Sequence, residues 1–163
     1  MSSTPTPPSS RAGSFAQSVD EIRSLVGREA FLTDWVQLSQ RHIDLFAEAT
    51  GDFQWIHVDV ERSRQQSPYG NTIAHGFLTL SLLPHLMELA YSVSDIRMGV
   101  NYGLNRVRFI TPVPAGSRVR GHFKLLDFQD LPGGAQLTTE VTVELEGSSK
   151  PACVAESVSR GFV

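Results

Sequence analysis

The chain has 163 residues, 40% of them hydrophobic and 19% charged, a composition typical of a soluble globular protein with one domain. Its formal net charge of −3 gives no indication of a nucleic-acid partner, and no apolar run reaches the roughly eighteen residues that a membrane-spanning helix needs. The only cysteine, Cys153, excludes an intramolecular disulfide and is typical of the reducing cytoplasm. We therefore expect a cytoplasmic protein with one domain.

Residues 1–14, MSSTPTPPSSRAGS, are rich in Ser, Pro and Thr and lack the apolar stretch of a signal peptide. This composition predicts a disordered tail, followed by a folded domain over residues 15–163. At the start of the domain, apolar spacing predicts a short helix over residues 15–26, ended by Gly27. A strand is expected over residues 31–39, FLTDWVQLS.

Capping and helix-breaking residues mark the helices in the middle of the chain. Ser39 is a good N-cap and Gly51 suits the left-handed position that often ends a helix, so a helix is predicted between them. Asp59 can cap a further, shorter helix. Residues 76–90 are apolar on nearly all sides, which predicts a helix buried over most of its surface. Pro84 within this segment predicts a bend or a boundary between two helices.

The chain after Met98 is rich in β-branched and aromatic residues and therefore indicates strands. The strands are expected at 107–113, 117–128, 136–146 and 153–163, with turn residues at 114–116, 132–134 and 147–149. Short connections predict that consecutive strands pair antiparallel. A helical first half and a stranded second half favour the α+β class, with a buried helix against an antiparallel sheet.

The segment from residue 46 to 83 holds the residues that indicate chemistry. It places Asp52 five residues before His57, and then a His75-Gly76 pair that opens the apolar helix. A carboxylate and an imidazole can transfer protons near neutral pH, and the first amides of a helix can stabilise a developing negative charge. The segment therefore predicts an active site, although Asp52 can equally be a turn or cap residue and His57 a half-buried structural histidine.

Other polar residues admit two interpretations each. His75 can contact a substrate, or it can form a hydrogen bond to its own helix end or to the preceding loop. Ser81 can face a ligand pocket or pack within the helix. Cys153 has no base nearby in the sequence and is interpreted as a small buried residue. A metal centre built on His57 and Asp59 is the weakest hypothesis, because the other histidines lack partners at ligand spacing.

Several segments resemble a known family when they are taken together and in order. The chain contains TGDFQWIHVD, TIAHG, VNYGLNRVRF, PVPAGSRVR and KPACVAES. These segments resemble the MaoC-like (R)-specific enoyl-CoA hydratases, in particular their NodN-like branch. The resemblance runs from about residue 34 to the C-terminus.

This resemblance implies one hot-dog fold, in which an antiparallel β-sheet wraps around a long central α-helix, and a homodimer of such units. It implies reversible hydration of a trans-2-enoyl thioester of CoA or acyl carrier protein to the (R)-3-hydroxyacyl thioester, in fatty-acid metabolism. Asp52 and His57 would hold the reacting water, and the amide of Gly76 would donate to the thioester oxygen. Further substrate-binding candidates are His75, Gln54 and Ser81. Because no redox step occurs, no metal and no cofactor besides the acyl-CoA substrate itself is implied.

One departure and two alternatives qualify this expectation. The better-studied hydratases have Asn-Pro where this chain has Gln54 and Trp55, so the hydrogen bonding around the catalytic pair does not transfer. A hot-dog acyl-CoA thioesterase would hydrolyse the thioester, but the central helix offers only Glu88, late in its length, as the acid. A non-catalytic acyl-thioester-binding accessory protein would have lost the chemistry, and the presence of both Asp52 and His57 argues against it.

Overall fold

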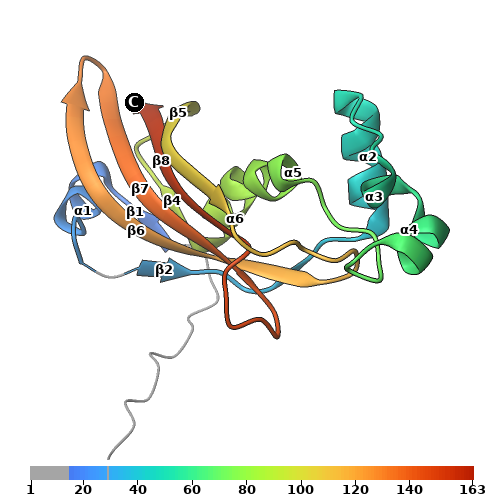
Figure 1. The fold of residues 1–163 in the computed structure, drawn as a ribbon. Helices are drawn as coiled ribbons and strands as arrows, with labels where there is room; N and C mark the ends of the chain where they lie inside the picture. Colours follow the sequence, from blue (N-terminus) through green and yellow to red (C-terminus); the bar gives the residue numbers. More distant parts are fainter. Residues whose placement is uncertain (1–14, 29) are drawn as a thin grey trace, which may run out of the picture.

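The computed structural model describes residues 15–28 and 30–163, so the disordered tail predicted at residues 1–14 lies outside the described part of the chain. The described residues form an antiparallel sheet, a helix packed across one face of that sheet, and a group of helices beyond one end of it (Figure 1). No helix in this part of the chain is long and apolar enough to cross a membrane.

The main sheet has six strands, all in antiparallel pairings. They are β2 (Ala30–Leu32), β3 (Val36–Gln37), β5 (Met98–Phe109), β6 (Arg118–Leu131), β7 (Gly134–Leu145) and β8 (Cys153–Phe162). Their order is β2-β6-β7-β8-β5, and β3 pairs with β6. The α+β class and the antiparallel sheet are therefore confirmed.

Alternation along β7 gives the sheet one dry face. Every second residue of the strand is buried: Ala135, Leu137, Thr139, Val141, Val143 and Leu145. Successive side chains of a strand point to opposite faces, so these six lie on the side of the core and the residues between them lie on the other side. Phe123 of the neighbouring strand β6 is 0% exposed in the same core. The strand predicted over residues 136–146 is therefore confirmed, with bounds shifted by one or two residues.

The position of β5 contradicts the expectation that consecutive strands pair. β5 pairs with β8 rather than β6 and so lies at an edge of the sheet. The segment just before the central helix, residues 72–74, forms hydrogen bonds to the connection between β5 and β6. The amide of Ala74 donates to the carbonyl of Val113 over 2.8 Å, and the amide of Ala115 donates to that of Thr72 over 2.9 Å. These bonds lead the connection away from β5 and also fix the segment that enters the central helix.

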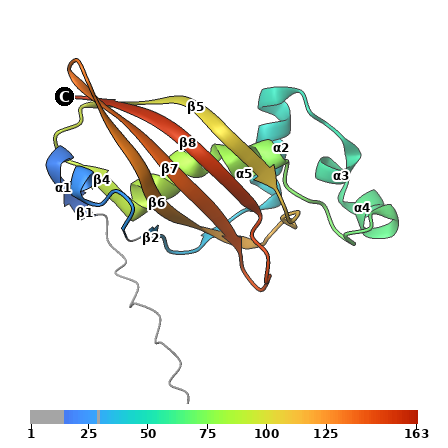
Figure 2. The ribbon, with the colours of Figure 1, turned by 60° about the vertical axis from the view of Figure 1, so that its left-hand side comes forward.

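The central helix consists of α5 (Gly76–Ser81) and α6 (Leu83–Ala90), and the sheet curves around it (Figure 2). Leu82 separates the two, and Pro84 lies in the first turn of α6, where its missing N–H removes no helical hydrogen bond. The predicted boundary at Pro84 is thus confirmed. The expectation that this helix is buried on most sides is wrong for a single chain, because Phe77 is 68% exposed on it.

The N-terminal region holds less regular structure than predicted. The helix α1 (Val19–Ser24) is shorter than expected, because residues Phe15–Gln17 form β1, which pairs in parallel with β4 (Tyr91–Val93). The strand predicted over residues 31–39 consists of the two short strands β2 and β3. Between them the Thr33 hydroxyl accepts from the amide of Gly121 over 3.0 Å, so a side chain replaces part of the strand pairing.

Three short helices lie beyond the end of the sheet (Figure 1). They are α2 (Gln40–Thr50), α3 (Trp55–Val58) and α4 (Val60–Gln66). The caps predicted for α2 are confirmed: the Ser39 hydroxyl accepts from the amide of His42, and Gly51 has a φ of 78°. Asp59 caps α4 by accepting from the amide of Arg62 over 2.9 Å. The four-residue helix α3 was not predicted.

Candidate active site

Asp52 lies in the loop that follows α2. The left-handed conformation of Gly51 turns the chain out of the helix, and Asp52 is the next residue. One oxygen of its carboxylate accepts from the amide of Gln54 over 3.3 Å, which is a local turn of the kind that aspartate often forms. The side chain of Asp52 is 55% exposed, so this carboxylate is hydrated and open to a ligand.

His57 lies on α3 and is 7% exposed. Its Nδ1 lies 2.7 Å from the carbonyl oxygen of Ile73, and because a carbonyl can only accept, Nδ1 carries the proton of the neutral ring. Burial lowers the pKa of His57, an effect that the hydrogen bond to Ile73 and the charge of Asp52 oppose and the neighbouring His75 reinforces. The histidine is therefore neutral at pH 7, with an unprotonated Nε2 that can accept a proton.

Gln40, at the first position of α2, fixes the backbone of the same histidine. Its side-chain amide donates to the carbonyl of His57 over 2.8 Å and to the carboxylate of Asp44 over 2.9 Å. The hydroxyl of Thr72 donates to the other end of the Gln40 amide. Gln40 therefore joins α2, α3 and the segment before the central helix. No local pattern in the sequence indicates Gln40, because its contact with His57 joins residues 17 apart.

His75 brings Asp52 and His57 together. Its Nε2 donates to the backbone carbonyl of Asp52 over 2.9 Å and lies 4.0 Å from the carboxylate. Its ring stacks on that of His57, with 3.8 Å between the centroids. One nitrogen of each histidine and one oxygen of Asp52 lie within 4.8 Å of one another. The carboxylate of Asp52 and the rings of His57 and His75 therefore lie close together in the structure.

Gly76 follows this cluster and begins α5. Its amide is one of the first in the helix and has no partner within it, so it is free to donate to a ligand. A Cβ at this position would lie 2.8 Å from the ring of Phe109 at the end of β5. Glycine is therefore required by the close approach of the central helix to β5.

The cluster of three side chains does not have the arrangement of a metal site. Nε2 of His75 donates to a carbonyl and Nδ1 of His57 donates to another, so these two nitrogens are not free to ligate. Asp59, the partner in the metal hypothesis, caps α4 instead. Nδ1 of His75 has no partner in the described part of the chain but is buried, so Nε2 of His57 and the exposed carboxylate of Asp52 are the groups suited to proton transfer.

The other sequence candidates lie outside this cluster. Gln54 is exposed and meets Asp52 only through its backbone amide. The hydroxyl of Ser81 donates to the carbonyl of Phe77 over 2.7 Å, and this serine borders a pocket of about 350 Å³ between α5 and β5, which Leu104 also lines. Cys153 is buried and burial raises its pKa to about 11, so the thiol is not a nucleophile.

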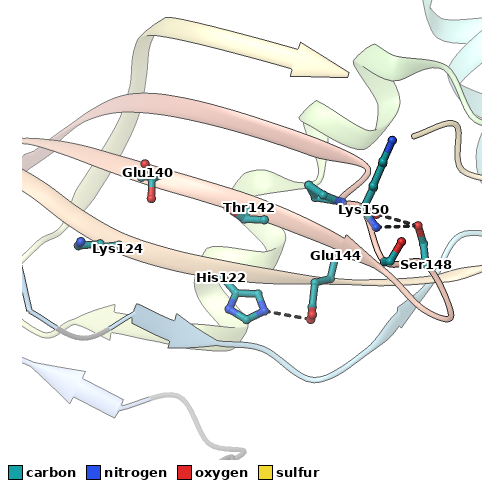
Figure 3. Close-up of a pocket in the computed structure, with 9 residues that line it drawn as sticks. His122, Lys124, Glu140, Thr142, Glu144, Ser148 and Lys150 are labelled. Carbon is teal, nitrogen blue, oxygen red and sulfur yellow. Dashed lines mark hydrogen bonds and ion pairs between the residues drawn. The ribbon is translucent and has the colours of Figure 1, made fainter. Parts of the chain in front are cut away.

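A second pocket, of about 400 Å³, lies on the face of the sheet that points away from the core (Figure 3). His122 and Glu144 form an ion pair there, with 2.9 Å between Nε2 and the carboxylate, and Arg120 contacts the same carboxylate. Asp52 and His57 do not line this pocket. Glu144 thus pairs with side chains of β6, and the pocket is a charged surface of the sheet rather than part of the site.

The curved antiparallel sheet around a central helix defines the hot-dog class, and solved structures of that fold superpose on the chain. R-hydratase PhaJ1 from Pseudomonas aeruginosa does so with a TM-score of 0.64 at 20% identity, over 84% of this chain and 81% of that one. The (R)-hydratase from A. caviae gives 0.62 at 21% identity, over 81% and 95%. At these identities the similarity establishes the fold alone, and the predicted hot-dog fold is confirmed.

The family follows from closer relatives. The model of the MaoC like domain matches residues 22–147. The 3-hydroxyacyl-thioester dehydratase Z of Mycobacterium tuberculosis is 52% identical over 145 residues, which cover 88% of this chain and 95% of that protein. Nodulation protein N of Rhizobium leguminosarum is 46% identical over 144 residues, which cover 87% and 89%. The chain therefore belongs to the MaoC-like dehydratase family, as the sequence segments predicted.

Proposed function

We propose that this protein is a hydro-lyase that adds water reversibly to a trans-2-enoyl thioester and forms the (R)-3-hydroxyacyl thioester, a reaction of fatty-acid metabolism. The observation that carries the proposal is the neutral, buried His57, whose imidazole has a nitrogen within 4.8 Å of a carboxylate oxygen of the exposed Asp52. The family supports it, and a relative with 52% identity is named a 3-hydroxyacyl-thioester dehydratase.

The two side chains take different roles in the proposed reaction. Nε2 of His57 removes a proton from the water as its oxygen bonds to Cβ, and Asp52 accepts a hydrogen bond from the same water. The electron pair of the double bond moves toward the thioester carbonyl and gives an enolate. The imidazolium of His57 then delivers a proton to Cα, so the elements of water are added and His57 returns to its neutral form. Asp52 stabilises the transient imidazolium by its charge.

The enolate oxygen requires a donor, and the amide of Gly76 is suited to this role. It lies next to His75 and therefore close to the catalytic pair, and it has no acceptor within α5. A donor fixed in place before the reaction stabilises the developing charge without reorganisation. The reaction involves no net oxidation or reduction, so the proposed chemistry requires no cofactor and no metal.

We also propose that the protein acts as a homodimer in the cytoplasm. β5 has twelve residues and lies at an edge of the sheet, with unpaired backbone groups along its free side. Its exposed side chains include Tyr102, at 58%, and Leu104, at 44%. A second copy of the same edge can pair with both the backbone and these side chains. The cytoplasmic location accords with the buried thiol of Cys153.

The test of the proposed function is a hydration assay with crotonyl-CoA and with longer trans-2-enoyl-CoA substrates. We expect loss of the enoyl absorbance and a product whose chiral analysis gives the (R)-alcohol. Release of free CoA thiol faster than hydration would identify a thioesterase instead. No turnover at any acyl length, with substrate nevertheless bound, would identify a non-catalytic accessory protein.

A further inference from the structure

The imidazole of His75 is enclosed by the residues that the proposed mechanism uses. The residue is 2% exposed, with the ring of His57 at 3.8 Å on one side and that of Phe46 at 4.9 Å, centroid to centroid. A side chain so enclosed offers no surface to a substrate. The expectation that His75 binds substrate directly is therefore replaced by a role through its neighbours.

The hydrogen bond from Nε2 of His75 fixes the loop that carries Asp52. Backbone bonds hold the ends of this loop, from the amide of Gly51 to the carbonyl of Ala47 and from the amide of His57 to that of Gln54. Asp52 itself forms two further hydrogen bonds: its amide reaches the Thr50 hydroxyl over 3.4 Å, and its carboxylate accepts from the amide of Gln54 over 3.3 Å. Both are longer than a typical hydrogen bond and both join near neighbours in the chain. The 2.9 Å bond from His75 joins the loop to the central helix instead. It therefore fixes the position of Asp52 relative to the amide of Gly76.

The stacked rings fix the plane of His57. A single hydrogen bond at Nδ1 leaves an imidazole free to rotate about that bond, which would move Nε2 away from a bound water. The face of His75 blocks this rotation. The charged and titratable groups beside His57 are His75 and Asp52. The stacking therefore holds the plane of the His57 ring, which lies close to the carboxylate of Asp52.

The state of Nδ1 of His75 indicates that a histidine is needed here for the N–H donor at Nε2. Nδ1 is buried and has no hydrogen-bond partner in the described part of the chain. A buried polar atom without a partner destabilises the folded protein, and a phenyl ring of similar shape would avoid that loss. The stacking alone would be served by phenylalanine. The donor at Nε2 is the property that only the imidazole supplies.

We propose that His75 is a positioning residue, whose Nε2–H anchors the Asp52 loop and whose ring face sets the orientation of His57. The roles of Asp52 and His57 rest on the proposed function, whereas the anchoring itself does not. The residue is not assigned to the chemistry itself, because it is 2% exposed, its ring is stacked on His57 and its Nε2 donates to the carbonyl of Asp52.

Two variants of His75 separate the donor from the ring. His75→Phe retains the stacked ring and removes the donor, whereas His75→Gln places an amide donor near Nε2 and removes the ring. We expect kcat of His75→Phe to fall by about 10- to 100-fold with KM within a few-fold, since small misplacements of catalytic groups have effects of this size. His75→Gln should keep the Asp52 loop anchored but still lose kcat, because the ring that orients His57 is gone. The thermal midpoint of His75→Phe should not fall, because the unpaired Nδ1 is gone.

Hydrogen exchange of the substrate-free protein supplies a readout that needs no activity. The amides of residues 51–54 should exchange faster in His75→Phe than in the wild type, and His75→Gln should restore their protection. Phe46→Leu, which changes the packing on the ring but leaves the donor, is the matched control and should leave that exchange unchanged. Equal kcat values for His75→Phe and the wild type, or wild-type protection of residues 51–54 in His75→Phe, would overturn the proposal. If the wild type hydrates no enoyl thioester, the proposed function fails while the exchange data still decide the anchoring.

Discussion

At the scale of single residues, the two catalytic candidates differ in their environment, and the difference assigns their roles. Burial favours the neutral form of His57, and its hydrogen bond to Ile73 leaves Nε2 without a proton. The side chain of Asp52 is 55% exposed and so can hold a water. A neutral acceptor beside a hydrated carboxylate suits the removal of a proton from water. The reverse assignment would place the charge on the buried ring before the reaction begins.

The first prediction concerns the loss of either group. His57→Asn removes the base and Asp52→Asn keeps the shape of the side chain without its charge. Each should lower kcat by about 10²- to 10⁴-fold, the usual contribution of a positioned proton-transfer group. The double variant should lose far less than the product of the two effects, because the groups act on one water. Enoyl-CoA absorbance measures the rates, and circular dichroism confirms the fold. A wild-type rate in either single variant would refute the assignment.

The second prediction concerns pH. The pKa of His57 is lowered from its ordinary value of 6.5, mainly by burial. As the pH falls below 6.5, the unfolded chain binds this proton before the folded one, so the free energy of unfolding declines until the folded pKa is passed. Above 6.5 the contribution of His57 to stability is complete. The acid limb of kcat/KM should accordingly lie below 6.5. An acid limb above pH 6.5 in the pH profile of kcat/KM would contradict the assignment of His57 as a buried neutral base.

At the scale of elements, the third prediction concerns the contact between α5 and β5. Gly76→Ala would place a methyl group 2.8 Å from the ring of Phe109, closer than atoms pack. Overpacking of this kind typically destabilises by about 1–3 kcal/mol. The shift would also move the amide of residue 76, so kcat should fall along with the thermal midpoint. Gly99→Ala is the control, since a Cβ there meets nothing within 4 Å. Equal behaviour of the two variants would show that the close approach is unimportant.

Helix ends were predictable from the sequence because their causes are local. Ser39, Gly51 and Asp59 each act within four residues of their own position, through a side-chain cap or a positive φ. The four-residue helix α3 was missed because it is too short to show periodicity. The pairing of β5 with β8 was missed for the opposite reason. It depends on bonds between residues 72–74 and 113–115, and nothing in either segment alone indicates the other.

The residues of the site also fall into two groups, those that the local sequence indicates and those that only the fold brings together. Asp52 and His57 lie five residues apart, so their pairing was visible in the segment itself and in its resemblance to a family. The bond from Gln40 to the backbone of His57 joins residues 17 apart, and that from His75 to Asp52 joins residues 23 apart. Such contacts depend on how the helices pack. The sequence therefore indicated the reacting groups, whereas the residues that hold them required the fold.

At the scale of the whole molecule, the two edges of the sheet are unequal. β2, at one edge, has three residues, whereas β5, at the other, has twelve. A long edge with exposed apolar side chains is a surface that a monomer seldom leaves uncovered. Phe77 of the central helix is 68% exposed and packs edge-on against Phe109 near this edge, so the apolar surface continues onto α5. The asymmetry indicates which edge is buried in the proposed homodimer.

The last prediction tests that edge. Leu104→Lys puts a charge on β5, where dimerisation would bury the leucine, and burial of such a side chain contributes about 1.5–3 kcal/mol. In sedimentation the wild type should behave as a dimer of the 17.9 kDa chain, and the variant should shift toward the monomer. Its kcat/KM should fall with dissociation, because Leu104 also lines the pocket beside α5. Val60→Lys, at a 39% exposed position on α4, is the matched control and should stay dimeric. A wild type that sediments as a fully active monomer would exclude the homodimer and leave the exposed surface of β5 for another partner.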